Sequence, residues 1–219
     1  MIAKIKYLST KEGECADDID LSKINNQNEK KFLLWSKNLE DTITRLQQSV
    51  EYFRELSNPI IFQTQILKKS YCFFFNLLSY LCIVITIDLG KLYSRKNSLC
   101  LYKYLNFCDN DSSYFKKEVN SMIFENKKIL ARLENKYEEE FKQPRNKIYG
   151  HSDKILLDEI AVDEMVKQVS VKDMELLVEL SKKILSSIWY AYNEQAMCFR
   201  LEGHDDYKNL LQLISTSNN

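Results

Sequence analysis

The sequence predicts an all-α protein, a single-domain helical bundle of four to five main helices. Glycine and proline number only four and two in 219 residues, too few for the many tight turns of a β-protein. Apolar residues recur at spacings of three and four over several long segments, which is the period of an amphipathic helix. A hydrophobic content of 45% is enough to build a full core in one domain of this length.

The pattern divides the chain into three parts. Residues 1–27 are polar and aperiodic, so we expect a loosely ordered N-terminal arm. Residues 28–203 carry the helical pattern and form the predicted bundle. Residues 204–219 form a C-terminal tail, and the sequence contains no repeat or linker that would mark a second domain.

A first long helix is expected from Phe32 to the tripeptide SNP at residues 57–59. Its inward face is a stripe of apolar residues three and four positions apart: Leu39, Ile43, Leu46, Val50 and Phe53. Proline ends this helix because its nitrogen carries no hydrogen to donate. Asn58 as N-cap and Pro59 at the first helical position then suit the start of a second helix.

The second helix contains residues 70–87, SYCFFFNLLSYLCIVITI, which carry no charge and approach the roughly 20 residues that span a bilayer. Four less apolar residues interrupt the run, and no second run provides a partner span. We therefore interpret the segment as a central bundle helix, buried on all sides and reaching Tyr93. A membrane anchor is the alternative interpretation.

The remaining elements follow from similar signals. After the basic connector SRKNS, a shorter helical segment is expected at residues 101–107. The DNDSS stretch at residues 109–113 offers N-caps for a third long helix, with an inward face of Val119, Met122, Ile123, Leu130, Leu133, Tyr137 and Phe141. Ser170 and Asp173 match a capping box at the start of the last long helix. Gly203 is its expected terminator, and its inward residues are Leu177, Leu180, Ile184, Ile188 and Tyr192.

Composition limits the classes of function. The formal net charge is zero, so attraction to nucleic acid or an anionic membrane must be local. Six cysteines without a CxxC pair indicate reduced thiols in a cytoplasmic protein rather than a disulfide framework. Neither histidine has a cysteine at ligand spacing, so we predict no metal and no cofactor. The N-terminus lacks the apolar core of a secretory signal.

Residues 144–154, PRNKIYGHSDK, combine an arginine with one of the two histidines of the chain. Arg145 and His151 are six positions apart, which on an ideal helix separates them by about 120° and roughly 9 Å. They converge on one atom only if helical geometry breaks or a second chain contributes. Gly150 makes a local distortion inexpensive.

This stretch has the residue types that RNA cleavage without a metal requires. Basic side chains outnumber the single acid Asp153, and a phosphate would settle there. Histidine moves protons near neutral pH, and arginine stabilises charge on phosphate oxygens. RNA offers the 2′-hydroxyl nucleophile that DNA lacks. From the residues alone, a role of Arg145 and His151 as surface or cap groups stays open.

The segment RNKIYGHSDK resembles the signature of the HEPN superfamily, in which arginine and a polar follower precede histidine by four to six intervening residues. Here five residues intervene, and Asn146 is the polar follower. The preceding EEEFKQP and the upstream ITIDLGKLYSRKNSLCLYKYL are similar to the AbiU-like branch of abortive-infection proteins. The resemblance covers roughly residues 30–200.

The resemblance implies a helical homodimer in which two copies of the motif meet at the subunit interface. It implies a metal-independent endoribonuclease used in antiphage defence or as a toxin, with RNA as substrate and an antitoxin or regulatory protein as a further partner. Arg145 and His151 would be catalytic, and Asn146 would orient the histidine or the phosphate. Lys147 and Lys154 would hold flanking phosphates. Asp153 replaces the tyrosine that a partner nucleotidyltransferase modifies in another HEPN branch, so that control is not expected here.

Several alternatives accompany this interpretation. Tyr149 either stacks on an RNA base or packs against the bundle. The whole protein could be a non-catalytic helical interaction protein, with Arg145 and His151 serving as hydrogen-bonding groups at a dimer interface. His204 lies beside Asp205 and Asp206, and we favour a solvated turn over a metal site there.

Overall fold

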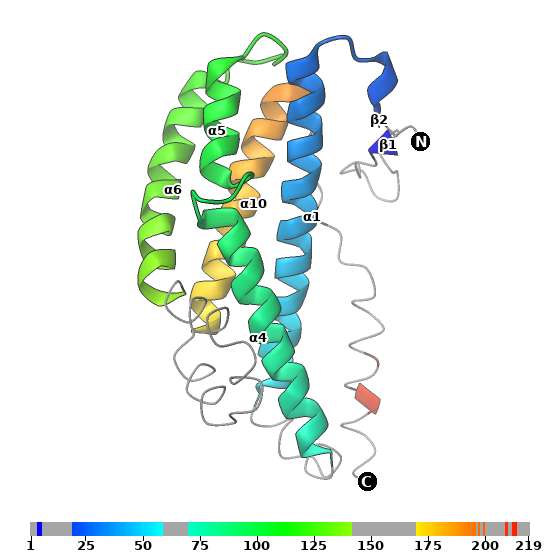
Figure 1. The fold of residues 1–219 in the computed structure, drawn as a ribbon, viewed down its shortest axis with the longest axis vertical. Helices are drawn as coiled ribbons and strands as arrows, with labels where there is room; N and C mark the ends of the chain where they lie inside the picture. Colours follow the sequence, from blue (N-terminus) through cyan, green and yellow to red (C-terminus); the bar gives the residue numbers. More distant parts are fainter. Residues whose placement is uncertain are drawn as a thin grey trace.

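The computed structural model describes residues 4–5, 19–58, 70–141 and 170–195, together with positions 197, 199, 209, 212 and 213. These residues form an all-α bundle, which confirms the predicted fold class (Figure 1). Four long helices run in alternating directions, and a short helix precedes the third: α1 (Gln27–Leu56), α4 (Tyr71–Tyr93), α5 (Leu101–Asn110), α6 (Asn120–Glu140) and α10 (Val171–Asn193).

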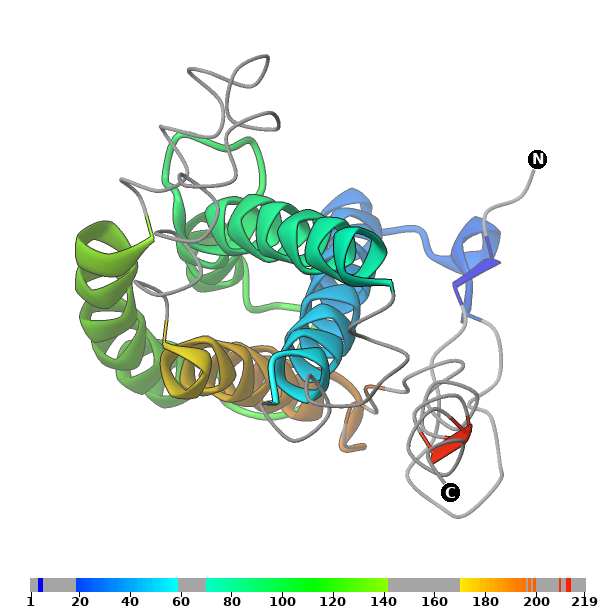
Figure 2. The ribbon, with the colours of Figure 1, turned by 90° about the horizontal axis from the view of Figure 1, so that it is seen from below.

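The long helices surround one core (Figure 2). α1 packs against both α4 and α10, and α6 completes the ring through contacts with α10 and α4. α5 lies against α6 and α1. Each described helix therefore packs against the next described helix along the chain, as in an up-and-down bundle.

Helix α1 has a capped N-terminus and buries the apolar stripe that its sequence predicts. The side chain of Asn26 caps its N-terminus by accepting hydrogen bonds from the backbone N–H groups of Asn28 and Glu29, at 2.8 and 3.2 Å. The predicted apolar stripe is buried along its whole length. The helix begins five residues before Phe32, because capping decides where it starts.

Two aromatic clusters fix the helices against one another. Phe32 on α1 stacks on Tyr104 of α5 and Trp189 of α10, with ring centroids 5.9 and 6.4 Å apart. Deeper along the bundle, Tyr93 stacks on Tyr137 at 5.9 Å, and its hydroxyl donates to the carbonyl of Leu177 at 2.7 Å. These contacts join elements far apart in the sequence into one core.

Helix α6 corrects one predicted boundary. It begins at Asn120 rather than after the DNDSS stretch, and Val119 stands at its N-cap without a side-chain capping bond. Asp111 is used elsewhere, because its carboxylate accepts from the Ser113 backbone at 3.1 Å and from the Asn28 side chain at 2.7 Å. The candidate cap therefore shapes the loop and ties it to α1.

Helix α10 corrects two further expectations. Ser170 is its N-cap, but the Ser170 side chain makes no capping hydrogen bond, and Asp173 forms an ion pair with Lys136 of α6 at 2.6 Å. The predicted capping box is therefore wrong, because the Ser170 side chain does not cap the helix and Asp173 pairs with α6 instead. The helix ends at Asn193, ten residues before Gly203, where Glu194 adopts a left-handed conformation with φ of 64°.

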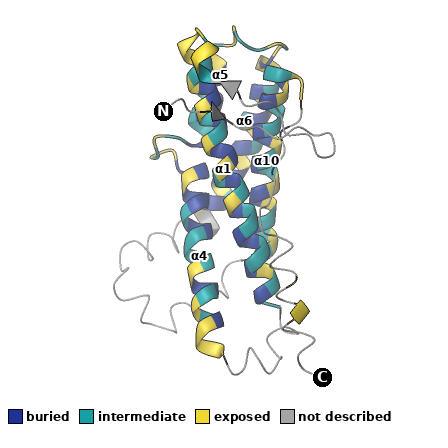
Figure 3. Ribbon diagram, turned by 90° about the vertical axis from the view of Figure 1, so that its right-hand side faces the viewer, coloured by how far each residue is buried: buried dark blue, intermediate teal, exposed yellow. Residues whose placement is uncertain are grey.

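The prediction that the second helix is buried on all sides is wrong for the first half of α4. Phe73 and Tyr80 are 64% and 59% exposed, and exposed residues continue along its first turns (Figure 3). These turns extend beyond the ends of α6 and α10, which therefore do not cover them (Figure 1). One described helix, α4, is long and apolar enough to cross a membrane, and half of that stretch is buried in the bundle.

The stretch predicted as an arm contains short ordered elements where it is described. β1 (Lys4–Ile5) and β2 (Ile19–Asp20) pair antiparallel, with Lys4 opposite Asp20 and Ile5 opposite Ile19. A single 3₁₀ turn, η1 (Leu21–Lys23), follows and leads into α1. Leu21 and Ile24 pack against the edge of the core.

The four described cysteines are free thiols, as the sequence predicts, and they differ in accessibility. Cys72 is exposed at the start of α4, whereas Cys82, Cys100 and Cys108 are buried. Burial raises the pKa of Cys82 to about 12, so this thiol stays protonated at neutral pH.

We predict that Cys72→Ser removes one rapidly reacting thiol from the native protein, because Cys72 is exposed at the start of α4. Cys82→Ala, the matched control, leaves the number of rapidly reacting thiols unchanged. Titration with a chromogenic disulfide reagent at pH 8, without and with denaturant, measures both. A fast thiol lost in Cys82→Ala instead would contradict the packing of α4.

Candidate functional site

The residues predicted to carry the chemistry lie outside the described residues. This applies to the catalytic pair Arg145 and His151, to their expected substrate-binding neighbours Asn146, Lys147, Tyr149 and Lys154, and to His204. The chain that carries the motif connects α6 to α10. The C-terminal end of α6 and the N-terminal end of α10 lie at the same end of the bundle (Figure 1).

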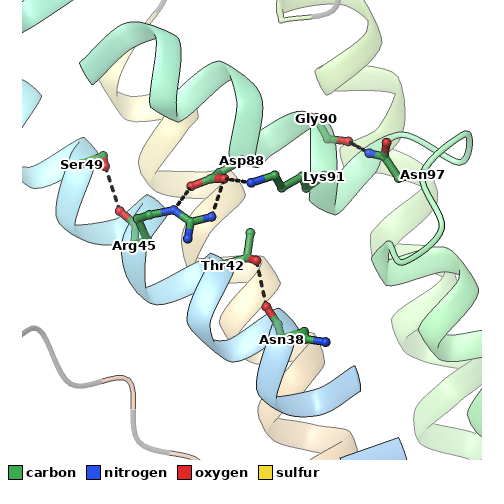
Figure 4. Close-up of polar contacts among 8 residues, drawn as sticks. All are labelled: Asn38, Thr42, Arg45, Ser49, Asp88, Gly90, Lys91 and Asn97. Atoms are coloured by element: carbon green, nitrogen blue, oxygen red, sulfur yellow. Dashed lines mark hydrogen bonds and ion pairs between the residues drawn. The ribbon is translucent and has the colours of Figure 1, made fainter. Parts of the chain in front are cut away.

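Among the described residues, the most distinctive polar cluster is built on Asp88, the acid within the apolar helix α4. Its side chain is only 1% exposed. Arg45 of α1 donates from Nε and Nη2 to the two carboxylate oxygens, both at 2.7 Å (Figure 4). Lys91, one turn further along α4, donates from Nζ to Oδ1 at 3.0 Å. A buried carboxylate needs such partners because leaving water costs it several kcal/mol.

Two cations share the Asp88 carboxylate in this cluster, and Asp41, itself paired with Lys37, also acts electrostatically on Arg45. The hydrogen bonds that Arg45 donates to Asp88 raise the pKa of the Arg45 guanidinium. Arg45 uses Nε and Nη2 for the carboxylate, so the ion pair leaves Nη1 uninvolved. About half of the Arg45 and Lys91 side chains is exposed, so both cations reach solvent while the acid does not.

The connector after α4 is fixed to the end of that helix. Asn97 donates from its side-chain amide to the carbonyl of Gly90 at 2.6 Å (Figure 4). The backbone N–H of Asn97 also bonds the carbonyl of Ser94, and Lys103 of α5 donates to the Asn97 carbonyl. The basic SRKNS connector is therefore held in place from both sides.

A second ion pair of the same form joins this connector to α6. Arg95 donates from Nε and Nη2 to the two carboxylate oxygens of Glu134, at 3.0 and 2.6 Å. Its guanidinium carbon lies 3.9 Å from the centre of the Tyr102 ring, a cation–π contact. The hydrogen bonds that Arg95 donates to Glu134 raise the pKa of Arg95. Glu134 is almost buried, whereas more than half of the Arg95 side chain is exposed.

Asp88, Lys91 and Arg95 belong to residues 85–105, the upstream segment that is similar to the AbiU-like branch, whereas Arg45 and Glu134 lie outside it. Sequence reasoning used the segment only as a similarity and gave Asp88 and Arg95 no role. A signal for Asp88 was present, because an acid in an apolar helix must find a cation. The sequence spacing gave no indication that Arg45, 43 residues away, supplies it.

Within the part of the chain that the structure describes, no group of three or more His, Cys, Asp or Glu side chains is placed to hold a metal ion. Comparison with protein-family models, with curated proteins and with solved structures finds no match. Membership of the HEPN superfamily therefore stays a prediction from the sequence motifs.

We predict that Arg45→Met lowers the free energy of unfolding by about 2 kcal/mol, because it leaves the buried Asp88 carboxylate with Lys91 alone. Lys91→Met keeps the two-point Arg45 pair and is expected to cost less than about 1 kcal/mol. Urea unfolding followed by circular dichroism measures both. Equal losses in the two variants would show that Arg45 is not the principal partner of Asp88.

Proposed function

We propose that this protein is a metal-independent endoribonuclease of the HEPN type, acting in antiphage defence or as a toxin. The observation that carries the proposal is the motif of Arg145, Asn146 and His151 in the connection between two long helices of an all-α bundle. The similar segment around α4 and α5 supports it, because the same order of segments occurs in the AbiU-like branch.

The proposed reaction uses the RNA itself as nucleophile. His151 removes the proton of a 2′-hydroxyl, and the oxygen attacks the adjacent phosphorus. The bond from phosphorus to the 5′-oxygen breaks, which leaves a 2′,3′-cyclic phosphate on one product. The leaving 5′-oxygen takes a proton from a second acid, for which the histidine of the other subunit is suited. Arg145 stabilises the negative charge that develops on the non-bridging oxygens.

A homodimer supplies the groups that one motif lacks. Arg145 and His151 diverge on a regular helix, so a two-fold axis that brings two motifs together provides both an acid and a base. Asn146 orients the histidine or the phosphate in this scheme, and Lys147 and Lys154 hold flanking phosphates. Tyr149 belongs to the same motif and would stack on a base in this scheme.

The proposal extends to the cellular setting. Reduced thiols fit a cytoplasmic protein, and a toxic RNase requires restraint by an antitoxin or regulatory protein. Asp153 stands where another HEPN branch has a modified tyrosine. The restraint proposed here is therefore by binding rather than by tyrosine modification.

A non-catalytic interaction protein is the second candidate, and the exposed apolar residues of α4 favour it. Phe73 and Tyr80 are more exposed than large apolar side chains usually are, and such surfaces mark binding sites for other proteins. In this case Arg145 and His151 are interface groups. Substituting Arg145 or His151 would then change the oligomeric state, and neither the wild type nor the variants would cut RNA.

We predict that the purified protein cuts single-stranded RNA in the presence of excess chelator. His151→Ala and Arg145→Ala each lower the cleavage rate by at least about 100-fold, because each removes a group that acts in the transition state. His204→Ala, which removes the other histidine, is the matched control and retains the wild-type rate. Cleavage is followed with a fluorescence-quenched oligonucleotide.

Helicity by circular dichroism must stay unchanged in all three variants, so that loss of activity reflects chemistry. Activity abolished by the chelator, or retained in both Arg145→Ala and His151→Ala, would contradict the proposed mechanism. No cleavage by the wild type, together with a shifted monomer–dimer equilibrium in the variants, would favour the interaction protein.

A further inference from the structure

The corner between α4 and α5 gathers cations on a neutral protein. We define the α4–α5 corner by Arg45, Lys91, Arg95, Lys96 and Lys103. Two acids, Asp88 and Glu134, pair with members of this group. Asp41 also acts electrostatically on Arg45 and pairs with Lys37, so cations still outnumber acids around the corner, although the formal net charge of the whole chain is zero.

At this corner the paired carboxylates are buried and their cations are exposed to solvent. The side chains of Asp88 and Glu134 are 1% and 11% exposed, whereas those of Lys91 and Arg95 are 51% and 57% exposed. Lys96 is exposed as well. An anion approaching from solvent therefore meets these cations before Asp88 or Glu134, and Glu138, four residues after Glu134 on α6, is an exposed acid.

Both arginines are held in the same way. Arg45 and Arg95 each use Nε and Nη2 to bind a carboxylate at two points, and these ion pairs leave Nη1 uninvolved. A guanidinium braced from behind loses little further conformational freedom when it binds an anion. The Tyr102 ring fixes Arg95 additionally. This geometry suits phosphate oxygens, which arginine binds through paired N–H groups.

The backbone of the corner is fixed as well. Asn97 ties the connector to Gly90 at the end of α4, and Lys103 reaches back from α5 to the carbonyl of Asn97. The cations thus lie on an anchored turn between two helices. Because the loop is already ordered in the folded protein, binding does not require a further loss of loop conformational entropy.

We propose that the α4–α5 corner binds the phosphodiester backbone of the RNA strand at a distance from the bond that is cut. Recognition of phosphates rests on the geometry above, and the choice of RNA rests on the proposed function. Glu134, which holds Arg95, precedes Phe141 by seven residues of α6 and its last turn, about 10 Å along the axis. The motif-bearing chain departs at that end, and single-stranded binding sites commonly cover about 4 to 16 nucleotides.

The test uses a fluorescein-labelled 20-nucleotide oligo(dT), which has phosphates but no 2′-hydroxyl and so cannot be cut by the proposed reaction. The double variant Lys91→Gln/Lys96→Gln removes two cations of the corner and keeps Arg45 on Asp88. The matched control, Lys116→Gln/Lys183→Gln, removes two exposed lysines. Lys183 is carried by α10, across the bundle from α4 (Figure 2). Thermal unfolding confirms that both variants are folded.

We expect the corner variant to bind oligo(dT) about 20-fold more weakly than the wild type at 0.1 M salt, because two phosphate contacts are lost. The slope of log K against log salt falls by about 1.4. The control variant binds within about two-fold of the wild type. Fluorescence anisotropy measures all three proteins.

Three results overturn the inference: no binding of oligo(dT) by the wild type, equal binding by the corner variant, or equal weakening in both variants. Binding to phosphatidylserine vesicles without binding to oligo(dT) would assign the corner to lipid headgroups, and so overturns it too. Specific oligo(dT) binding without cleavage of RNA would support the corner and contradict the proposed nuclease. Cleavage of RNA by a protein whose corner variant binds oligo(dT) as well as the wild type would support the proposed nuclease and contradict the role of the corner.

Discussion

The buried carboxylate of Asp88 sets the strongest constraint on this bundle. An acid in the most apolar helix costs several kcal/mol unless cations accompany it, and Arg45 and Lys91 satisfy it. The two-point pair with Arg45 adds a polar link between α1 and α4 to their buried apolar contacts. Because the acid faces inward and its partners reach solvent, the same requirement leaves cations on the surface. The proposed anion site rests on this arrangement.

The bundle relates this surface to the connection that carries the sequence motif. Arg95 is held by Glu134 of α6, and α6 continues for about two turns before the connection to α10 begins. The aromatic stack of Tyr93, Tyr137 and Phe141 makes that end of α6 part of the core. A rigid support at the start of the motif is what precise placement of a catalytic pair requires, and the proposed division of labour follows from it. The corner would hold the strand, and the motif would cut it.

The helices could be predicted because the apolar residues that recur every three or four positions are the ones buried in the core, as the stripe on α1 shows. The helix caps were harder to predict, because the expected capping residues bind side chains of other helices. Asp111 accepts a hydrogen bond from Asn28, and Asp173 pairs with Lys136. Hydropathy also gave the wrong burial for the start of α4, because it does not distinguish a covered face from an exposed one. The ion pairs of the corner join residues about 40 positions apart and leave no local signal. Arg145 and His151 stay a prediction from the motif and lie outside the described residues.

The identity of the ends of the cleaved RNA tests the central claim most directly. Attack by the 2′-hydroxyl requires a 2′,3′-cyclic phosphate on the upstream fragment and a free 5′-hydroxyl on the downstream fragment, whatever the sequence of the RNA. Mass spectrometry of the fragments from a defined oligonucleotide distinguishes these ends from those left by water. Cyclic phosphate ends are the predicted result. A 5′-phosphate on the downstream fragment would contradict the account.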